Sequence, residues 1–391
     1  MKLRKITLLI FIFLFLIPLI SVSDQVLTPI RAGQEQLNNP LMNGSTYPPN
    51  PSGFLSNGTP ICIENNIQSN PQICSDGAGG AIITWKDSRT DVYSRIYAQR
   101  INASGAVQWT TNGVAICINI NGQMAPMICS DGTGGAIITW IDWRSGSRSI
   151  YAQRVDASGV VQWTANGVAI SASTFELNLQ LCSDGAGGAI ITWEDSRSSN
   201  IDIYAQRVDG NGVVKWTSNG VAITNIAYHQ QYPQICSDGV GGAIITWEDR
   251  GSNTYNIYAQ RINGSGAIKW AANGIAICTA NNAQYKPQIC SDGAGGALIT
   301  WEDTRNGPYD IYAQHINASG TSQWAANGIA VCAANNGQYS PKICSDGAGG
   351  ALITWGDNRS NNLDIYAQRI DATGMMLWAA NGTAACKASG G

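Results

Sequence analysis

The chain has 391 residues, a formal net charge of −3, and only 13% charged residues. A net negative charge argues against nucleic acid and against an anionic membrane surface as partners. Its 44 glycines, with abundant asparagine, serine and threonine, favour a turn-rich extracellular β-protein over a disordered chain.

The first 23 residues have the pattern of a secretory signal peptide. A charged start at residues 2–5 precedes an apolar run at residues 6–22, and we expect cleavage near Asp24. An uncleaved membrane anchor is the alternative, but the apolar run is interrupted by Pro18 and is short for a span. Cleavage removes three basic residues and leaves 20 basic against 26 acidic, a net charge of −6. We therefore expect a secreted or cell-surface protein with no membrane span after cleavage.

Two regions follow the predicted signal peptide. Residues 24–55 are rich in proline and asparagine and show no periodicity, which indicates a linker. Residues 56–391 contain six copies of the stretch CSDGAGGALITW, with few changes, at intervals of 53 to 55 residues. Such spacing identifies a repeat protein. The copies cover residues 74–85, 129–140, 182–193, 236–247, 290–301 and 344–355.

Each repeat predicts four short strands, as the fifth copy illustrates. A first strand at 287–290 is followed by an Asp-Gly and Gly-Gly turn, where glycine accepts positive φ without steric cost. A second strand at 297–301 is rich in β-branched and aromatic residues, and a third lies at 311–315. The polar turn 317–320 then leads into a fourth strand ending at Trp324. No segment of the mature chain has a convincing helical period.

Six such units predict an all-β fold, a six-bladed β-propeller of four-stranded antiparallel blades. The segments NGTPIC, residues 57–62, and NGTAAC, residues 381–386, both match NGIAIC at 273–278, which makes seven copies for six places. We expect one terminal copy to close the ring and the other to be displaced. An open arc, or a ring completed by a second chain, is the alternative. A β-solenoid or a string of β-sandwiches fits a repeat of this length less well.

The chain has eleven cysteines. Six precede the Ser-Asp-Gly turn and five end an upstream NGxxxC segment, always twelve residues apart where both are present. In a secreted chain this spacing permits disulfides worth roughly 3 kcal/mol each, although cysteine as a small apolar filler is the alternative. Ser171 and Thr224 replace the upstream cysteine in two units, which leaves Cys182 and Cys236 single. The candidate disulfides join Cys62 with Cys74, Cys117 with Cys129, Cys278 with Cys290, and Cys332 with Cys344.

Metal and cofactor sites are not indicated. The sequence has no CxxC spacing and only two histidines, so we expect no metal. The repeated Ser-Asp-Gly aspartates supply one carboxylate per turn, which fits a turn cap better than a calcium loop. We expect no cofactor.

Polar residues recur after the second and third strands. An aspartate follows each tryptophan and usually precedes an arginine by two residues, while the third strand usually ends in Gln-Arg. These side chains could form an anion site or act as general acids, but a single active site does not need six copies. We therefore interpret them as hydrogen-bonding groups that join strands within each blade, and we assign no catalytic residue. Two units depart from the pattern, with Asp249 directly before Arg250 and with His315 after Gln314.

The two ends of each predicted blade differ in variability. The SDGxGG and NASG-type turns lie at one end and hardly vary, whereas the loop after Trp-x-Asp and the connector to the next blade do vary. Variation on a constant scaffold indicates recognition, and exposed aromatic residues suit stacking on sugars or gripping peptides, although each could simply cap its own loop. The candidate ligand-binding residues on this variable rim are Tyr93, Trp143, Glu176, Tyr228, His229, Tyr232, Tyr255, Tyr285, Tyr309 and Tyr339.

The repeat SDGxGGAIITWxDxR, followed by IYAQR, a tryptophan and NGxAIC, resembles the tandem repeats of secreted bacterial and archaeal surface proteins regarded as β-propellers. The resemblance covers about 56–386 and implies a propeller without implying an activity, because many such proteins have none assigned. The repeat is only distantly similar to the sialidase Asp-box, since Ser and Asp adjoin here and the Trp lies far downstream.

These patterns support two functional hypotheses. The first is a binding, adhesion or scaffold module whose ligand, an extracellular glycan or protein, lies on the variable rim. The alternative is a glycan-acting hydrolase or lyase of propeller fold. Such an enzyme should have one or two unpaired carboxylates with a raised pKa in a pocket, and the sequence does not single out such a pair.

Overall fold

The computed structural model shows an all-β protein. The part of the chain that it describes consists of six four-stranded antiparallel sheets and contains no helix, so none that could cross a membrane. This confirms the predicted six-bladed propeller of four-stranded blades. The predicted signal peptide (1–23) and linker (24–55) lie outside the described residues. The described residues are 58–90, 93–172, 176–251 and 254–387.

In each sheet, or blade, the strands pair in chain order. Blade one contains β1 (Gln68–Ser75), β2 (Ala81–Asp87), β3 (Arg95–Ile101) and β4 (Val114–Cys117). Blade two contains β5 (Gln123–Ser130), β6 (Ala136–Asp142), β7 (Ser149–Val155) and β8 (Val168–Ser171). Blade three contains β9 (Glu176–Ser183), β10 (Ala189–Asp195), β11 (Asp202–Val208) and β12 (Val221–Thr224).

The second half of the chain repeats this arrangement. Blade four contains β13 (His229–Ser237), β14 (Ala243–Arg250), β15 (Tyr255–Ile262) and β16 (Ile275–Cys278). Blade five contains β17 (Gln284–Ser291), β18 (Ala297–Asp303), β19 (Asp310–Ile316) and β20 (Ile329–Cys332). Blade six contains β21 (Gln338–Ser345), β22 (Ala351–Asp357), β23 (Asp364–Ile370) and β24 (Thr383–Cys386).

The aspartate of each Ser-Asp-Gly turn caps the hairpin between the first two strands. In blade five, Asp292 Oδ1 accepts hydrogen bonds from the backbone N–H groups of Ala294 (2.7 Å) and Gly296 (2.9 Å). Gly293 and Gly295 adopt φ of +76° and +88°, a conformation that favours glycine. The interpretation of these aspartates as turn caps is therefore confirmed.

The predicted fourth strand is wrong in position. The segment ending at Trp324 forms a single bridge, Ile316 to Ser322, while the NGxAIC segment supplies the real fourth strand, β20. The Gln314 side chain explains the difference. Its Oε1 accepts the Trp324 backbone N–H (3.1 Å) and its Nε2 donates to the Ala325 carbonyl (2.8 Å), so an amide side chain takes the place of ladder hydrogen bonds.

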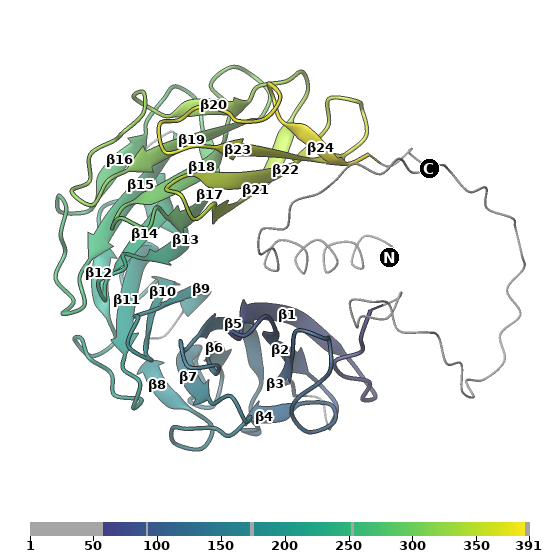
Figure 1. Ribbon diagram of the computed structural model, residues 1–391. Helices are drawn as coiled ribbons and strands as arrows, with labels where there is room; N and C mark the ends of the chain where they lie inside the picture. The colour runs from purple at the N-terminus through teal and green to yellow at the C-terminus, as the bar shows by residue number, and fades with distance from the viewer. Residues whose placement is uncertain (1–57, 91–92, 173–175, 252–253, 388–391) are drawn as a thin grey trace, which may run out of the picture.

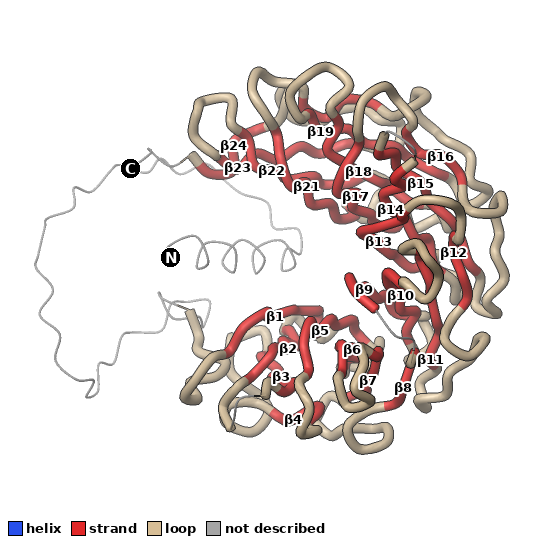
Figure 2. Tube along the Cα trace, turned by 180° about the vertical axis from the view of Figure 1, so that it is seen from behind, coloured by secondary structure: helices blue, strands red, loops and turns tan. Residues whose placement is uncertain are grey.

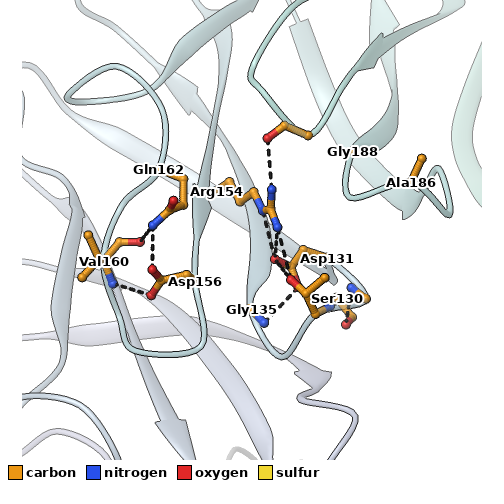
Figure 3. A network of polar contacts seen from close by, with 12 residues as sticks. Ser130, Asp131, Gly135, Arg154, Asp156, Val160, Gln162, Ala186 and Gly188 are labelled. Carbon is orange, nitrogen blue, oxygen red and sulfur yellow. Dashed lines mark hydrogen bonds and ion pairs between the residues drawn. The ribbon is translucent and has the colours of Figure 1, made fainter.

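Neighbouring blades share hydrophobic cores and polar links. One core joins residues of blades two and three around Trp193, which has no exposed surface. Arg154 forms an ion pair with Asp131 of its own blade at 2.9 Å (Figure 3) and donates to the Gly210 carbonyl of the next blade at 3.1 Å. Trp163 Nε1 donates to the same carbonyl at 3.0 Å. The repeated Gln-Arg pair thus joins strands within a blade, as predicted, and its arginine also joins blades.

The blades form an arc (Figures 1 and 2). The first strands, from β1 to β21, follow its inner side, the fourth strands follow its outer side, and blades one and six lie apart at its two ends. Exposure agrees with this arrangement, because Trp378 of blade six is 42% exposed whereas the equivalent Trp163 is 8% exposed. The structure is therefore an open arc, which was the alternative to the expected closed ring.

The two terminal copies of NGxxxC have different places. The copy at 381–386 contributes β24 to blade six. The described part of the N-terminal copy, residues 58–62, lies against blade one. Directly after it, the Ile63 N–H donates to Asn112 Oδ1 at 3.0 Å, as the Ile118 N–H of blade one does to Asn166 of blade two at 2.9 Å. The N-terminal copy is thus the displaced one, held where the end of a preceding blade would lie.

The candidate disulfides are wrong. All eleven cysteines are free thiols. Cys117 Sγ lies 3.8 Å from Asp142, and Asp142 is the register partner of Gln123 in β5. Cys129 is six residues further along β5, about 20 Å from Gln123 and so from the position of Cys117. A disulfide needs Cα atoms within about 7 Å. The same arrangement separates Cys62 from Cys74, Cys278 from Cys290, and Cys332 from Cys344. The alternative, cysteine as a small apolar filler, fits their positions.

Candidate functional site

Four of the candidate tyrosines form a chain of ring contacts across blades four, five and six. The ring centroids lie 5.0 Å apart for Tyr255 and Tyr285, 6.1 Å for Tyr285 and Tyr309, and 5.4 Å for Tyr309 and Tyr339. These separations are typical of favourable tilted aromatic pairs. All four side chains are half-buried, so part of each remains open to solvent. We call these four residues the tyrosine ladder.

The backbone beside the tyrosine ladder is irregular. Tyr285 and Tyr339 are the second residues of β17 and β21, and a β-bulge begins directly after each. The next residues, Lys286 and Ser340, have φ of +52° and +54°. A bulge bends its strand and redirects the adjoining side chains, and bulges are common beside functional sites.

A hollow of about 160 Å³ lies on the first strands of blades four to six. Two lysines line it, with Lys286 Nζ 3.0 Å from Glu302 Oε1 and Lys342 Nζ 3.0 Å from Gln288 Oε1. Lys286 directly follows Tyr285 of the tyrosine ladder in the sequence. The lining residues of the hollow are Tyr232, Gln234, Lys286, Pro287, Gln288, Ser340, Pro341 and Lys342.

Buried glutamates form hydrogen bonds with the backbone of the bulges in this region. In blades three to five the residue after the second-strand tryptophan is a glutamate that accepts the backbone N–H of the bulge residue in the following blade, at 2.6 Å each time. These glutamates are not among the residues predicted from the sequence, although the repeats differ at this position, where Lys86, Ile141 and Gly356 stand in the other blades. The three pairs are Glu194 with Tyr232, Glu248 with Lys286, and Glu302 with Ser340.

Glu248 has a strongly shifted acidity. Burial, together with smaller contributions from the Glu302 and Glu194 carboxylates, raises the pKa of the Glu248 carboxyl to about 7, while the Lys286 backbone N–H opposes the shift. Glu248 is only 2% exposed. A carboxyl of this kind is protonated in a large fraction of molecules at neutral pH.

Glu248→Gln is expected to change how stability depends on pH. Because the folded chain binds this proton more tightly than the unfolded chain, the carboxyl lowers stability progressively as pH rises from about 4.5 to about 7. The variant should match the wild type at pH 4 and exceed it by about 3 kcal/mol at pH 8. Urea unfolding of both proteins at the two pH values measures this, and an equal difference at both would contradict it.

The remaining candidates lie away from the tyrosine ladder or inside the protein. Tyr93 and Tyr228 are 55% and 51% exposed, and Trp143 is also exposed, with Arg148 over its ring at 5.3 Å. Glu176 is fully buried and lies opposite Asp195 in the register. The remaining two are His229, whose Nδ1 accepts the Ile201 backbone N–H at 3.0 Å, and Tyr232, in the hollow.

No protein-family model and no curated protein sequence matches the chain. Among solved structures, a Hadza microbial sialidase aligns with a TM-score of 0.41 and 12% identity, covering 74% of this chain and 63% of its own. An α-L-arabinanase of Penicillium chrysogenum complexed with arabinobiose aligns with a TM-score of 0.45 and 12% identity, covering 80% and 96%. An α-L-arabinofuranosidase of Fusarium graminearum aligns with a TM-score of 0.44 and 10% identity, covering 78% and 93%. Similarity at this level carries no information on activity.

Proposed function

We propose that the protein is a secreted or cell-surface propeller that binds a glycan along the tyrosine ladder of blades four to six. The observation that carries the proposal is the row of four half-buried tyrosine rings, drawn from three blades and each in contact with the next. Aromatic rings with an accessible surface stack on the apolar faces of sugars, and a row of them suits an extended chain of sugar units.

The polar groups of the hollow complement this surface. Lys286 and Gln288 of blade five and Lys342 of blade six offer amine and amide groups, and such groups bind sugar hydroxyls or an acidic substituent. The signal-like first 23 residues and the resemblance to repeats of secreted bacterial and archaeal surface proteins support an extracellular site of action.

A glycan array followed by titration of the retained glycans tests the proposal. The double variant Tyr285→Ala with Tyr309→Ala removes the centre of the tyrosine ladder and should weaken binding at least tenfold. Tyr93→Ala serves as the matched control, since Tyr93 is an exposed tyrosine of blade one, and should bind as the wild type does. An array that retains no glycan, or a double variant with unchanged affinity, would rule out this site.

A glycan-acting hydrolase or lyase of propeller fold is the second candidate function. The observation that favours it is the Glu248 carboxyl, whose pKa of about 7 suits a general acid at neutral pH, next to the tyrosine ladder. An enzyme would release new reducing ends or unsaturated products from the glycans that it binds. Glu248→Gln would then abolish turnover and preserve binding, whereas a binding protein would release no product in either form.

A further inference from the structure

Five of the six blades hold an arginine side chain in the same way, at a place that we call the arginine socket. In blade five the Arg305 guanidinium donates to Asp303 Oδ2 (2.6 Å) and to the Asn327 carbonyl (2.8 Å), and its central carbon lies 3.9 Å from the centre of the Tyr312 ring. The socket therefore consists of a carboxylate, a carbonyl and an aromatic face. The arginines that fill it are Arg89, Arg144, Arg197, Arg305 and Arg359.

Blade four has the socket without its arginine. The equivalent residues are Asp249, Tyr258 and Asn273, but the residue two places after the aspartate is Gly251. Arg250 does not substitute for the missing side chain, because it is exposed and lies over the Tyr255 ring at 5.4 Å. Within the described ranges, no cation lies over Tyr258 and no group donates a hydrogen bond to the Asp249 carboxylate.

Three buried polar groups of this socket lack partners in the described part of the chain. Asp249 is only 6% exposed, and Trp247 Nε1 has no hydrogen-bond partner. Thr224 stands at the position where Cys278 contacts Arg305 of blade five, and its Oγ1 also has no partner. In blade five the equivalent Trp301 Nε1 donates to Asp303 at 2.8 Å. Burial raises the pKa of Asp249 to about 6, so its carboxyl is still mostly ionised at neutral pH. An unpaired buried carboxylate is unfavourable, and a cation in the socket would offset that cost.

We propose that blade four binds a guanidinium group from outside the chain, in the socket formed by Asp249, Tyr258 and Asn273. The other blades show the complementary shape, since each places a planar guanidinium flat on a tyrosine while two of its edges meet oxygen atoms. An ammonium ion cannot reproduce this combination of stacking and forked hydrogen bonds. The group could belong to an arginine of another protein or to a free guanidino compound, and the site is independent of the proposed glycan binding.

Calorimetric titration with N-acetyl-arginine amide, and with N-acetyl-lysine amide as the equally charged comparison, tests this proposal. The arginine derivative should bind with one site per chain and at least tenfold more tightly than the lysine derivative. Asp249→Asn should weaken binding at least tenfold, and it should still fold because it removes an unpaired buried charge. A five-residue glycine-serine peptide with a central arginine distinguishes an arginine of another protein from a free guanidino compound. Binding of the peptide indicates that the socket admits an arginine within a polypeptide, whereas binding of the small derivative alone indicates a free guanidino compound.

Three further variants keep the test independent of folding effects at Asp249. Gly251→Arg restores the arginine that the other blades possess and should abolish binding while retaining or raising stability. Arg305→Ala empties the socket of blade five and should produce a second site. Arg250→Ala should bind as the wild type does. No binding of the arginine derivative, or equal binding by the wild type, Asp249→Asn and Gly251→Arg, would overturn the proposal.

Discussion

Trp163→Ala is expected to lower the free energy of unfolding by about 3–5 kcal/mol, the range for removing a large buried aromatic side chain. Trp163 is 8% exposed and belongs to the core shared by blades two and three. A Cβ on Gly212 of the next blade would lie only 2.8 Å from its ring, which shows how closely the indole packs there. The substitution therefore opens a cavity between two blades and removes the hydrogen bond from Nε1 to Gly210.

Trp378→Ala provides the matched control. Trp378 occupies the same position in blade six, where no blade follows, and it is 42% exposed. Its removal should cost less than that of Trp163, about 1–2 kcal/mol, because 42% of its surface already meets water. Urea unfolding followed by fluorescence measures both changes. Equal losses for the two variants would show that packing between blades is not what stabilises this tryptophan.

Gly220→Ala is expected to cost about 2–4 kcal/mol, although it adds a single methyl group. Gly220 has φ of +87°, and a Cβ there would lie 2.6 Å from the Trp193 ring and 2.8 Å from the Ala205 carbonyl oxygen. Strained backbone and overpacking of a buried ring therefore act together. The thermal unfolding temperature of the variant should fall accordingly.

Gly185→Ala separates the two causes. Gly185 has a similar φ of +75°, but a Cβ there meets nothing within 4 Å, so only the backbone strain of about 1 kcal/mol remains. A Gly185→Ala loss as large as that of Gly220→Ala would mean that contact with Trp193 is unimportant.

The repeated hairpins and blades could be predicted because their signals are local. The positive φ that favours glycine at Gly293 and Gly295 and the β-branched and aromatic residues of 297–301 are features of short stretches of sequence. The fourth strand was misplaced because its position depends on a side chain from another strand, Gln314, which bonds the backbone near Trp324. The disulfides failed for a similar reason, since a spacing of twelve residues does not reveal that Cys117 and Cys129 lie on strands of different blades and far apart.

The candidate site was partly visible in the sequence. Tyr255, Tyr285, Tyr309 and Tyr339 stood out because they vary between otherwise constant repeats, and the structure brings them into one row. The role of Glu248 was not visible, because its partner is a backbone N–H in the next blade. The one-residue shift of the arginine after Asp249 is visible in the sequence, but only packing shows that it leaves a buried carboxylate without its arginine.

The free ends of the arc set an order for the loss of structure. Blades two to five each share an interface on both sides, whereas blades one and six each share only one, so the terminal blades are the least stabilised by their neighbours. Opening therefore starts at the termini and moves inward, and amide hydrogens of the middle blades exchange last. The tyrosine ladder spans blades four to six, so fraying of the C-terminal end dismantles it first at Tyr339, while the socket of Asp249 stays intact longer.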